Sequence, residues 1–176
     1  MQSRELRRHF EGKMEFEQQE RRHVQYIPRI QGEKIFMPLP LCHSRGSGDI
    51  RNNEVRSLAK GMGLSENHFK RSVRCDHERE CDLLCLATRL LTDCESAPQV
   101  APPNVIIPSV EKILAEVERK QSSIQTRREW KTQEREALEI SKDKLQRLAQ
   151  VNQELRDVAF SIIRLIDRGM EPVLTP

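Results

Sequence analysis

The stretch from 109 to 168 most restricts what this chain can fold into, because it contains neither glycine nor proline. Pro108 precedes it and Gly169 follows it, and Ser109 can cap a helix that begins there. Sixty residues in one helix, at about 1.5 Å of rise each, give a rod about 90 Å long. One small domain cannot cover a helix of that length, so the stretch predicts an elongated molecule.

Apolar residues recur every seven positions along this stretch. The main series is Val110, Val117, Ile124, Lys131, Leu138, Leu145, Asn152, Ala159 and Ile166. A companion series three places later is apolar at its two ends and polar in the middle. A strict seven-residue repeat is typical of a left-handed coiled coil. We therefore predict that a seam binds a partner helix through Leu138, Leu145, Leu148, Asn152, Leu155, Ile162 and Ile166.

Asn152 interrupts this seam, and an asparagine at such a position is known to fix the register of parallel helix pairs. The repeat leaves a homodimer, a heteromer and an intramolecular hairpin open. The remaining alternative is a solvent-bridging helix whose periodicity is accidental. We favour a second chain, because the other helices expected from the sequence are too short and too thinly striped to cover the whole rod.

The composition agrees with narrow apolar stripes rather than a large core. Hydrophobic residues make up 36% of the chain, aromatic residues 4% and charged residues 32%. The 30 basic and 27 acidic residues are interspersed, which suits charge-laced helices better than a dedicated polyanion binder. The first residues are charged where a signal peptide would be apolar, and no stretch is long and apolar enough for a membrane span. We expect a soluble intracellular protein, cytoplasmic or cytoskeletal rather than nuclear, with no membrane contact.

Upstream of the rod, the predicted organisation is a series of short pieces. An N-terminal helix over 1–23 is indicated by Leu6, Phe10 and Met14, which recur at four-residue spacing. A proline-containing extended tract follows over 24–50, a helical hairpin over 51–95, a proline-rich spacer over 96–108, the long helix over 109–168 and a tail over 169–176. The fold class predicted is therefore mostly α, elongated, with helices joined by extended segments.

The tract over 24–50 is the most apolar part of the N-terminal half. Its prolines exclude a helix, and an extended segment that carries large side chains is typical of a chain lying along a groove. The groove can belong to a partner or to this protein, and a linker that covers its own helices is an equal alternative. The residues predicted to dock are Tyr26, Ile27, Phe36 and Leu39.

Residues 57–73, SLAKGMGLSENHFKRSV, indicate two short helices that meet at a sharp corner. Ala59 is a small residue in the first helix, Gly63 is at the turn, and Phe69 is placed to pack the second helix back. Over about twenty residues this pattern resembles the helix-turn-helix motif of DNA-binding proteins. The resemblance implies contacts to the major groove and phosphates from Ser65, Asn67, His68, Lys70 and Arg71. The alternative is a simple bend with a small core, and we favour it because the first helix is short and Glu66 would bring an acid to the DNA.

The five cysteines are odd in number, and four of them fall within twenty positions. Cys75, His77, Cys81 and Cys85 are weak candidates for metal ligands. If His77, Cys81 and Cys85 lie on one helix, the third ligand is about 12 Å from the first and cannot reach the same ion without a break in the helix. We therefore expect free, buried thiols, with no metal and no cofactor.

The sequence contains no glycine-rich phosphate loop, no HExxH pair and no nucleophile elbow. We predict no catalytic residues and a non-enzymatic scaffold or adaptor in a larger intracellular assembly, with a cytoskeletal setting such as a microtubule or axoneme. Its partners would be proteins, bound through the coiled coil and the extended tract. The alternative is a dimeric helix-turn-helix protein that binds DNA, or a chromosomal protein of the kinetochore type.

Overall fold

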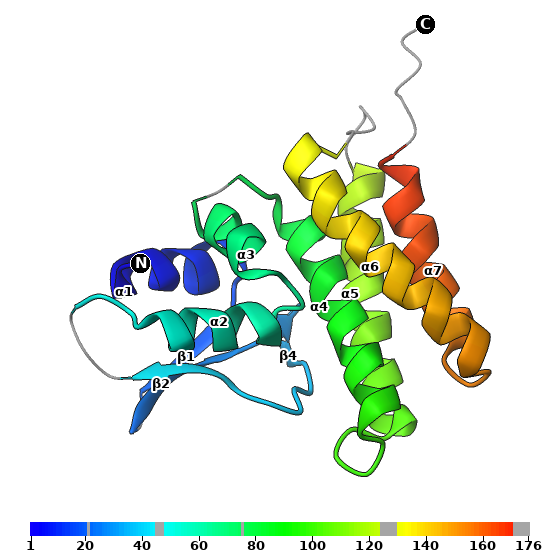
Figure 1. Ribbon diagram of the computed structural model, residues 1–176, viewed down its shortest axis with the longest axis horizontal. Helices are drawn as coiled ribbons and strands as arrows, with labels where there is room; N and C mark the ends of the chain where they lie inside the picture. The colour runs from blue at the N-terminus through cyan, green and yellow to red at the C-terminus, as the bar shows by residue number, and fades with distance from the viewer. Residues whose placement is uncertain (21, 45–47, 75, 124–129, 171–176) are drawn as a thin grey trace, which may run out of the picture.

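The computed structural model describes all residues except 21, 45–47, 75, 124–129 and 171–176, and the side chains of 122 and 123 are also outside the description. Two parts lie side by side, a helix-and-sheet part and a bundle of long helices (Figure 1). The prediction of a mostly helical protein is confirmed, but the chain also contains small antiparallel sheets.

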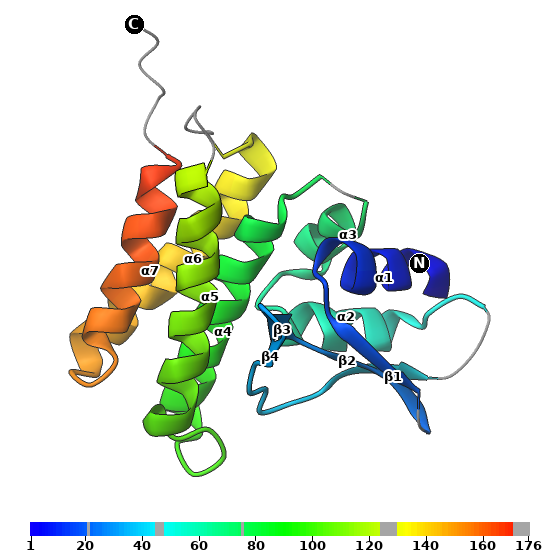
Figure 2. The ribbon, with the colours of Figure 1, turned by 180° about the vertical axis from the view of Figure 1, so that it is seen from behind.

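The N-terminal part places helices on one side of a three-stranded sheet (Figures 1 and 2). The sheet has the order β1-β2-β5, and both pairs are antiparallel. A two-residue hairpin pair, β3 and β4, follows β2. In chain order the elements are α1 (Ser3–Arg7), the π-helix η1 (Arg8–Lys13), β1 (Glu17–Glu20), β2 (His23–Ile27), β3 (Arg29–Ile30), β4 (Glu33–Lys34), β5 (Leu41–Ser44), α2 (Asn52–Gly61) and α3 (Glu66–Val73).

The helix predicted over 1–23 is only half as long as expected. Leu6, Phe10 and Met14 do face the core and are fully buried, as their spacing predicts. The helical run ends at Lys13, and Glu15 takes a positive φ of 59° that no helix contains. The chain then turns back as β1, so the prediction of one continuous N-terminal helix is wrong.

The tract over 24–50 is extended in part, as its prolines predict, but it belongs to the protein's own sheet. Val24 and Tyr26 alternate with exposed or half-buried residues along β2, and Tyr26 stacks on Phe10 with ring centroids 4.3 Å apart. Tyr26 and Ile27 are 2% and 5% exposed, so these two predicted docking residues are part of the chain's own core. The tract therefore covers its own helices, at least over β2.

The stretch over 109–168 is not one helix. The C-terminal part is a bundle of α4 (Arg79–Ser96), α5 (Pro103–Ser123), α6 (Thr132–Val151) and α7 (Arg156–Arg168), as Figures 1 and 2 show. In this bundle α4 packs on α5 and α6, and α7 packs on α5 and α6. Glu134 accepts a hydrogen bond from the Lys131 backbone amide at 2.7 Å and helps to begin α6. The prediction of a single rod is therefore wrong.

The seven-residue repeat reports burial inside this bundle. All the apolar members of the predicted seam are at most 3% exposed: Leu138, Leu145, Leu148, Leu155, Ile162 and Ile166. They pack in one continuous core that also takes in residues of the N-terminal part. The repeat left a homodimer, a heteromer and an intramolecular hairpin open, and α6 and α7 pack against each other within one chain. Their seam side chains are therefore not free to bind another chain. Ile124 lies outside the described residues.

The proline-rich spacer is shorter than expected. Helix α5 begins at Pro103 and contains Pro108. Proline suits the first position of a helix, where its missing N–H would have no partner in any case. Ser109 therefore lies inside α5 and not at its start, and its hydroxyl accepts a hydrogen bond from the Phe36 backbone amide at 3.1 Å.

The corner between α2 and α3 is present where the sequence predicts it. Gly63 has a φ of 74°, and a Cβ atom there would come within 2.3 Å of the carbonyl oxygen of Cys85 on α4. The turn thus needs glycine for its backbone conformation and for its close approach to the bundle. Within the described ranges, no helix has the length and hydrophobicity needed to cross a bilayer.

Candidate functional site

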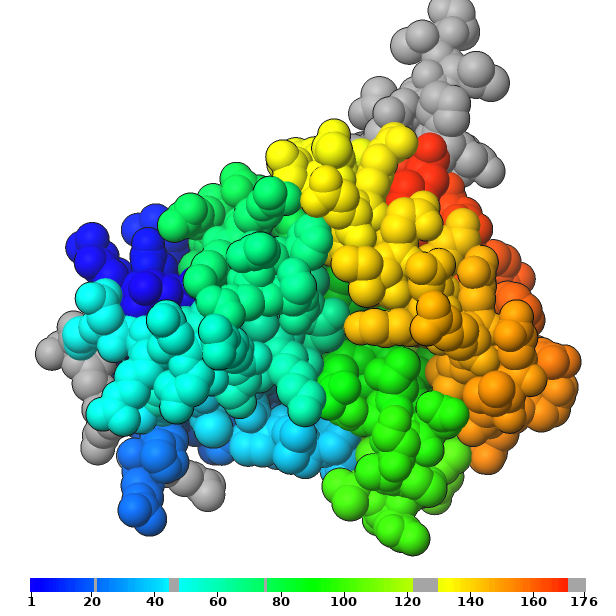
Figure 3. Space-filling model, viewed as in Figure 1, coloured from blue at the N-terminus to red at the C-terminus, as the bar shows by residue number. Residues whose placement is uncertain are grey.

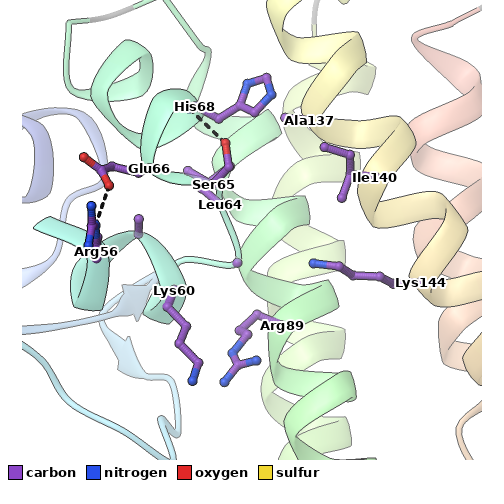
Figure 4. Close-up of a pocket in the computed structure, with 12 residues that line it drawn as sticks. Arg56, Lys60, Leu64, Ser65, Glu66, His68, Arg89, Ala137, Ile140 and Lys144 are labelled. Carbon is purple, nitrogen blue, oxygen red and sulfur yellow. Dashed lines mark hydrogen bonds and ion pairs between the residues drawn. The ribbon is translucent and has the colours of Figure 1, made fainter. Parts of the chain in front are cut away.

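A groove of about 270 Å³ runs along the boundary between the two parts (Figure 4). One wall comes from α2, the turn after it and the start of α3, and the other comes from α4 and α6. On the face drawn in Figure 3, the α2–α3 corner lies beside both of these helices. We call this feature the basic groove. Its lining residues are Arg56, Ala59, Lys60, Gly63, Leu64, Ser65, Glu66, His68, Arg89, Ala137, Ile140 and Lys144.

The charges in the basic groove are unequal. Arg56 and Lys60 come from α2, Arg89 from α4 and Lys144 from α6, whereas Glu66 is the one acidic residue in the lining. Arg56 donates to Glu66 at 2.8 Å. No ion pair to Lys60 or Lys144 is found among the described residues. The groove therefore presents a positive surface that is only partly neutralised.

Arg89 is the most enclosed of the four cations. Its guanidinium forms an ion pair with Asp93 at 2.5 Å, and the side chain is 24% exposed. Its Nε atom is buried and has no hydrogen-bond partner among the described residues. Burial raises the pKa of Asp93, although Arg89 and Lys60 act in the opposite direction. A buried N–H that faces no acceptor is costly, so an acceptor brought by a ligand would be favourable here.

The residues expected to contact DNA are placed around the same corner but are largely engaged. The Ser65 hydroxyl caps α3 by accepting from the His68 amide at 3.2 Å, and His68 itself is 9% exposed. Lys70 forms an ion pair with Glu66 at 2.6 Å, and Arg71 forms one with Glu136 of α6 at 3.4 Å. Asn67 is exposed. DNA binding through these side chains stays a prediction.

Sequence reasoning missed the four cations of the basic groove. Arg56 and Lys60 are four residues apart, so one face of α2 could have been read as basic. Arg89 and Lys144 are far from α2 in the sequence, and the helix bundle alone brings them to the groove.

A second cluster of polar groups is buried beside the corner. Asp82 of α4 is fully buried, and its Oδ2 accepts hydrogen bonds from the Ser72 hydroxyl at 2.5 Å and from Lys13. Its Oδ1 lies 3.2 Å from Nδ1 of His77. Burial raises the pKa of Asp82, but the His77 hydrogen bond and the Lys13 charge outweigh it and bring the pKa to about 2. The carboxylate is therefore ionised and well satisfied at neutral pH.

His9 lies near this cluster, with its ring edge-on to Phe10 and Phe69. Burial lowers the pKa of His9 to about 4, so its ring is neutral at physiological pH. Neither of its ring nitrogens has a hydrogen-bond partner among the described residues.

Two of the weak metal candidates are brought together. His77 and Cys81 each offer a ligand atom within 4.8 Å of the other and of an Asp82 oxygen. The hydrogen bond between Cys81 and Cys85 raises the pKa of the Cys81 thiol, and the burial of Cys81 raises it further. Cys85 also accepts from the Ser141 hydroxyl at 3.6 Å. Cys75 lies outside the described residues.

The other predicted partner-binding residues are divided between core and surface. Phe36 and Leu39 are 38% and 57% exposed, and Phe36 helps to line a second, mostly apolar hollow of about 460 Å³ beside β2. Asn152 is half-buried at the end of α6, and its Oδ1 accepts from the Leu155 amide at 3.2 Å. It shapes a turn, whereas the sequence predicted that it fixes the register of a coiled coil.

Comparison with protein-family models, with curated proteins and with solved structures finds no match to this chain. The chain is therefore classified by its fold and its site alone. A small layer of strands and helices packs on a bundle of the four helices α4 to α7, and the basic groove lies between them.

Proposed function

We propose that this chain is a non-enzymatic adaptor that binds an acidic segment of a partner protein in the basic groove. The observation that carries the proposal is the convergence of Arg56, Lys60, Arg89 and Lys144 from three helices on a groove with one carboxylate in its lining. Complementary charge across an interface selects partners and speeds their encounter. Arginine clusters are a recurring means of recognising acidic motifs.

The floor of the groove favours a protein segment over a small inorganic anion. Ala59, Leu64 and Ala137 provide buried apolar surface, and Ile140 is 47% exposed at the edge. Burying the exposed half of this isoleucine side chain is favourable by about 1 kcal/mol. A segment that carries an apolar side chain between carboxylates would meet both the floor and the cations.

The arrangement of acids supports a protein partner over nucleic acid. Glu66 lines the groove, and Glu136 lies near the corner, where it pairs with Arg71. A phosphate backbone presents negative charge continuously and is best met by a basic stripe without acids. The groove is also small, with a volume of about 270 Å³.

Phe36 and Leu39 offer a second contact for the same partner, because they are the exposed part of the tract that was predicted to dock. The coiled-coil seam is not part of this proposal, since its apolar side chains are buried in the chain's own core. The cytoskeletal setting stays a prediction.

Fluorescence anisotropy with a labelled acidic peptide of alternating Glu and Leu residues tests the proposal. We expect saturable binding that weakens at least about 10-fold in the Lys60→Glu, Lys144→Glu double variant, because two attractive contacts become repulsive. The matched control is Arg4→Glu with Arg8→Glu, which makes the same charge change at two exposed positions at the N-terminus, in α1 and η1. The control variant should bind within about 2-fold of the unmodified chain.

A labelled DNA duplex serves as the competing probe. Equal loss of peptide binding in both variants would show that net charge alone is responsible, and the groove proposal would be rejected. Tight, steeply salt-dependent binding of the duplex with no peptide binding would instead favour the helix-turn-helix alternative.

A further inference from the structure

The buried polar cluster beside the α2–α3 corner has a feature that hydrogen bonding leaves unexplained. His68 and His77 are 9% and 2% exposed, and their rings lie 5.6 Å apart between centroids. His68 Nδ1 and His77 Nε2 are both buried with no hydrogen-bond partner among the described residues. Two neighbouring imidazoles with unused nitrogens are costly to bury unless something accepts or binds them.

We propose that His68, His77 and Cys81 bind a divalent transition-metal ion of the zinc type, with Asp82 orienting His77. Imidazole nitrogen and thiolate sulfur are the ligands that zinc prefers in proteins. The ligand atoms offered by His77, Cys81 and Asp82 lie within 4.8 Å of one another. His77 and Cys81 are therefore close enough to share one ion, whereas His68, whose ring centroid lies 5.6 Å from that of His77, would reach it from α3 by a side-chain movement.

The local chain geometry explains how residues 77 and 81 can share an ion. Helix α4 begins at Arg79, so His77 precedes the helix and Cys81 lies in its first turn. The side chain of His77 can therefore fold back over the helix start. His68 comes from α3, and the ion would join the corner to the bundle.

The bond between His77 and Asp82 has the form that metal sites use. Nδ1 of His77 lies 3.2 Å from Oδ1 of Asp82, which leaves the lone pair of Nε2 free to bind a metal ion. A histidine that binds a metal through one nitrogen commonly donates the other N–H to a carboxylate, which fixes the ring. Oδ2 of Asp82 stays with Lys13 and Ser72.

The charges around the cluster are compatible with a dication. Lys13 is compensated by Asp82, with which it forms an ion pair. The Cys81 thiolate would supply one negative charge, and the buried carboxylate of Glu134 acts electrostatically on Cys81. His68 also lines the basic groove, which gives the ion a route from solvent.

Titration of the reduced, metal-free full chain with Co²⁺ tests the proposal. We expect one ion per chain, a near-ultraviolet band from thiolate-to-cobalt charge transfer, and loss of the band when Zn²⁺ is added. Cys81→Ser should abolish the charge-transfer band, and His77→Gln should weaken Co²⁺ binding at least about 10-fold.

Cys94→Ser is the matched control, because Cys94 is equally buried on the same helix α4 but is not part of the cluster. It should keep the band and the affinity. Far-ultraviolet circular dichroism verifies that each variant is folded, and His68→Gln gives a second readout if Cys81→Ser is not. The proposal is overturned if the unmodified chain shows no charge-transfer band, or if Cys81→Ser keeps it.

Discussion

The role of Asn152 in the structure differs from the role that the sequence predicts for it. In the sequence it interrupts an apolar repeat, which is typical of a register-setting position in a coiled coil. In the structure it ends α6 with an extended backbone, φ −126° and ψ 103°, and its side chain accepts from the Leu155 amide. The seven-residue repeat continues past Asn152 because the residues of the repeat in α6 and those in α7 are buried in the same core.

Replacing Asn152 with alanine should lower the free energy of unfolding by about 1 kcal/mol, the usual cost of losing a capping hydrogen bond. Replacing it with leucine should also destabilise, because leucine cannot make this bond. The neighbouring exposed Gln153→Ala is the control and should change stability by less than about 0.5 kcal/mol. Chemical denaturation measures all three, and a stabilising Asn152→Leu would instead indicate an uninterrupted coiled-coil seam.

Among the elements, α5 is tied to the rest of the chain by Glu116. This side chain is 3% exposed and accepts from Arg79 of α4 at 2.8 Å, from Arg119 at 3.1 Å and from Gln31 at 3.3 Å. Burial raises the pKa of Glu116, but these hydrogen bonds outweigh it, and the pKa lies below the ordinary value of 4.5. One carboxylate thus connects the bundle with the turn between β3 and β4.

Glu116→Gln should cost about 2 kcal/mol of stability at pH 7, because it removes the closer and more buried of the two carboxylates, Glu116 and Glu15, that pair with Arg79. Since the pKa in the folded state is lowered, this contribution is complete above about pH 5 and is lost as the pH falls through the folded-state pKa. The two proteins should therefore become similar in stability at acid pH. Glu118→Gln on the same helix, whose side chain is 60% exposed, should cost less than about 0.5 kcal/mol at any pH. A pH-independent difference between Glu116→Gln and the unmodified chain would contradict the assignment.

The sequence predicts which faces of the elements are buried better than it predicts what covers them. Leu138, Leu145 and Ile166 are buried, as their spacing requires, yet a repeat does not tell whether the covering helix belongs to the same chain. Strand β1 reads Glu-Gln-Gln-Glu, which has no apolar alternation, so pairing with β2 alone defines it. The helix corner was predictable from Gly63, whereas the cations that face it come from residues distant in the sequence.

For the whole molecule, the difference between the predicted rod and the observed packing is large enough to measure. A compact chain of 176 residues has a radius of gyration of about 16 Å. A rod about 90 Å long would by itself give about 26 Å. Small-angle X-ray scattering of the monomeric protein should give a value near the smaller figure, and a value close to the larger one would restore the single long helix.

The close approach of Gly63 to the carbonyl of Cys85 has one further consequence for the molecule. The backbone of Gly63 packs directly against the backbone of α4 at this point, so the spacing between the corner and α4 is set by a close backbone contact. The backbone of the groove walls is then preorganised, and a partner would lose affinity only to the ordering of exposed side chains such as Lys60 and Lys144. A partner should therefore find the groove already at its final width.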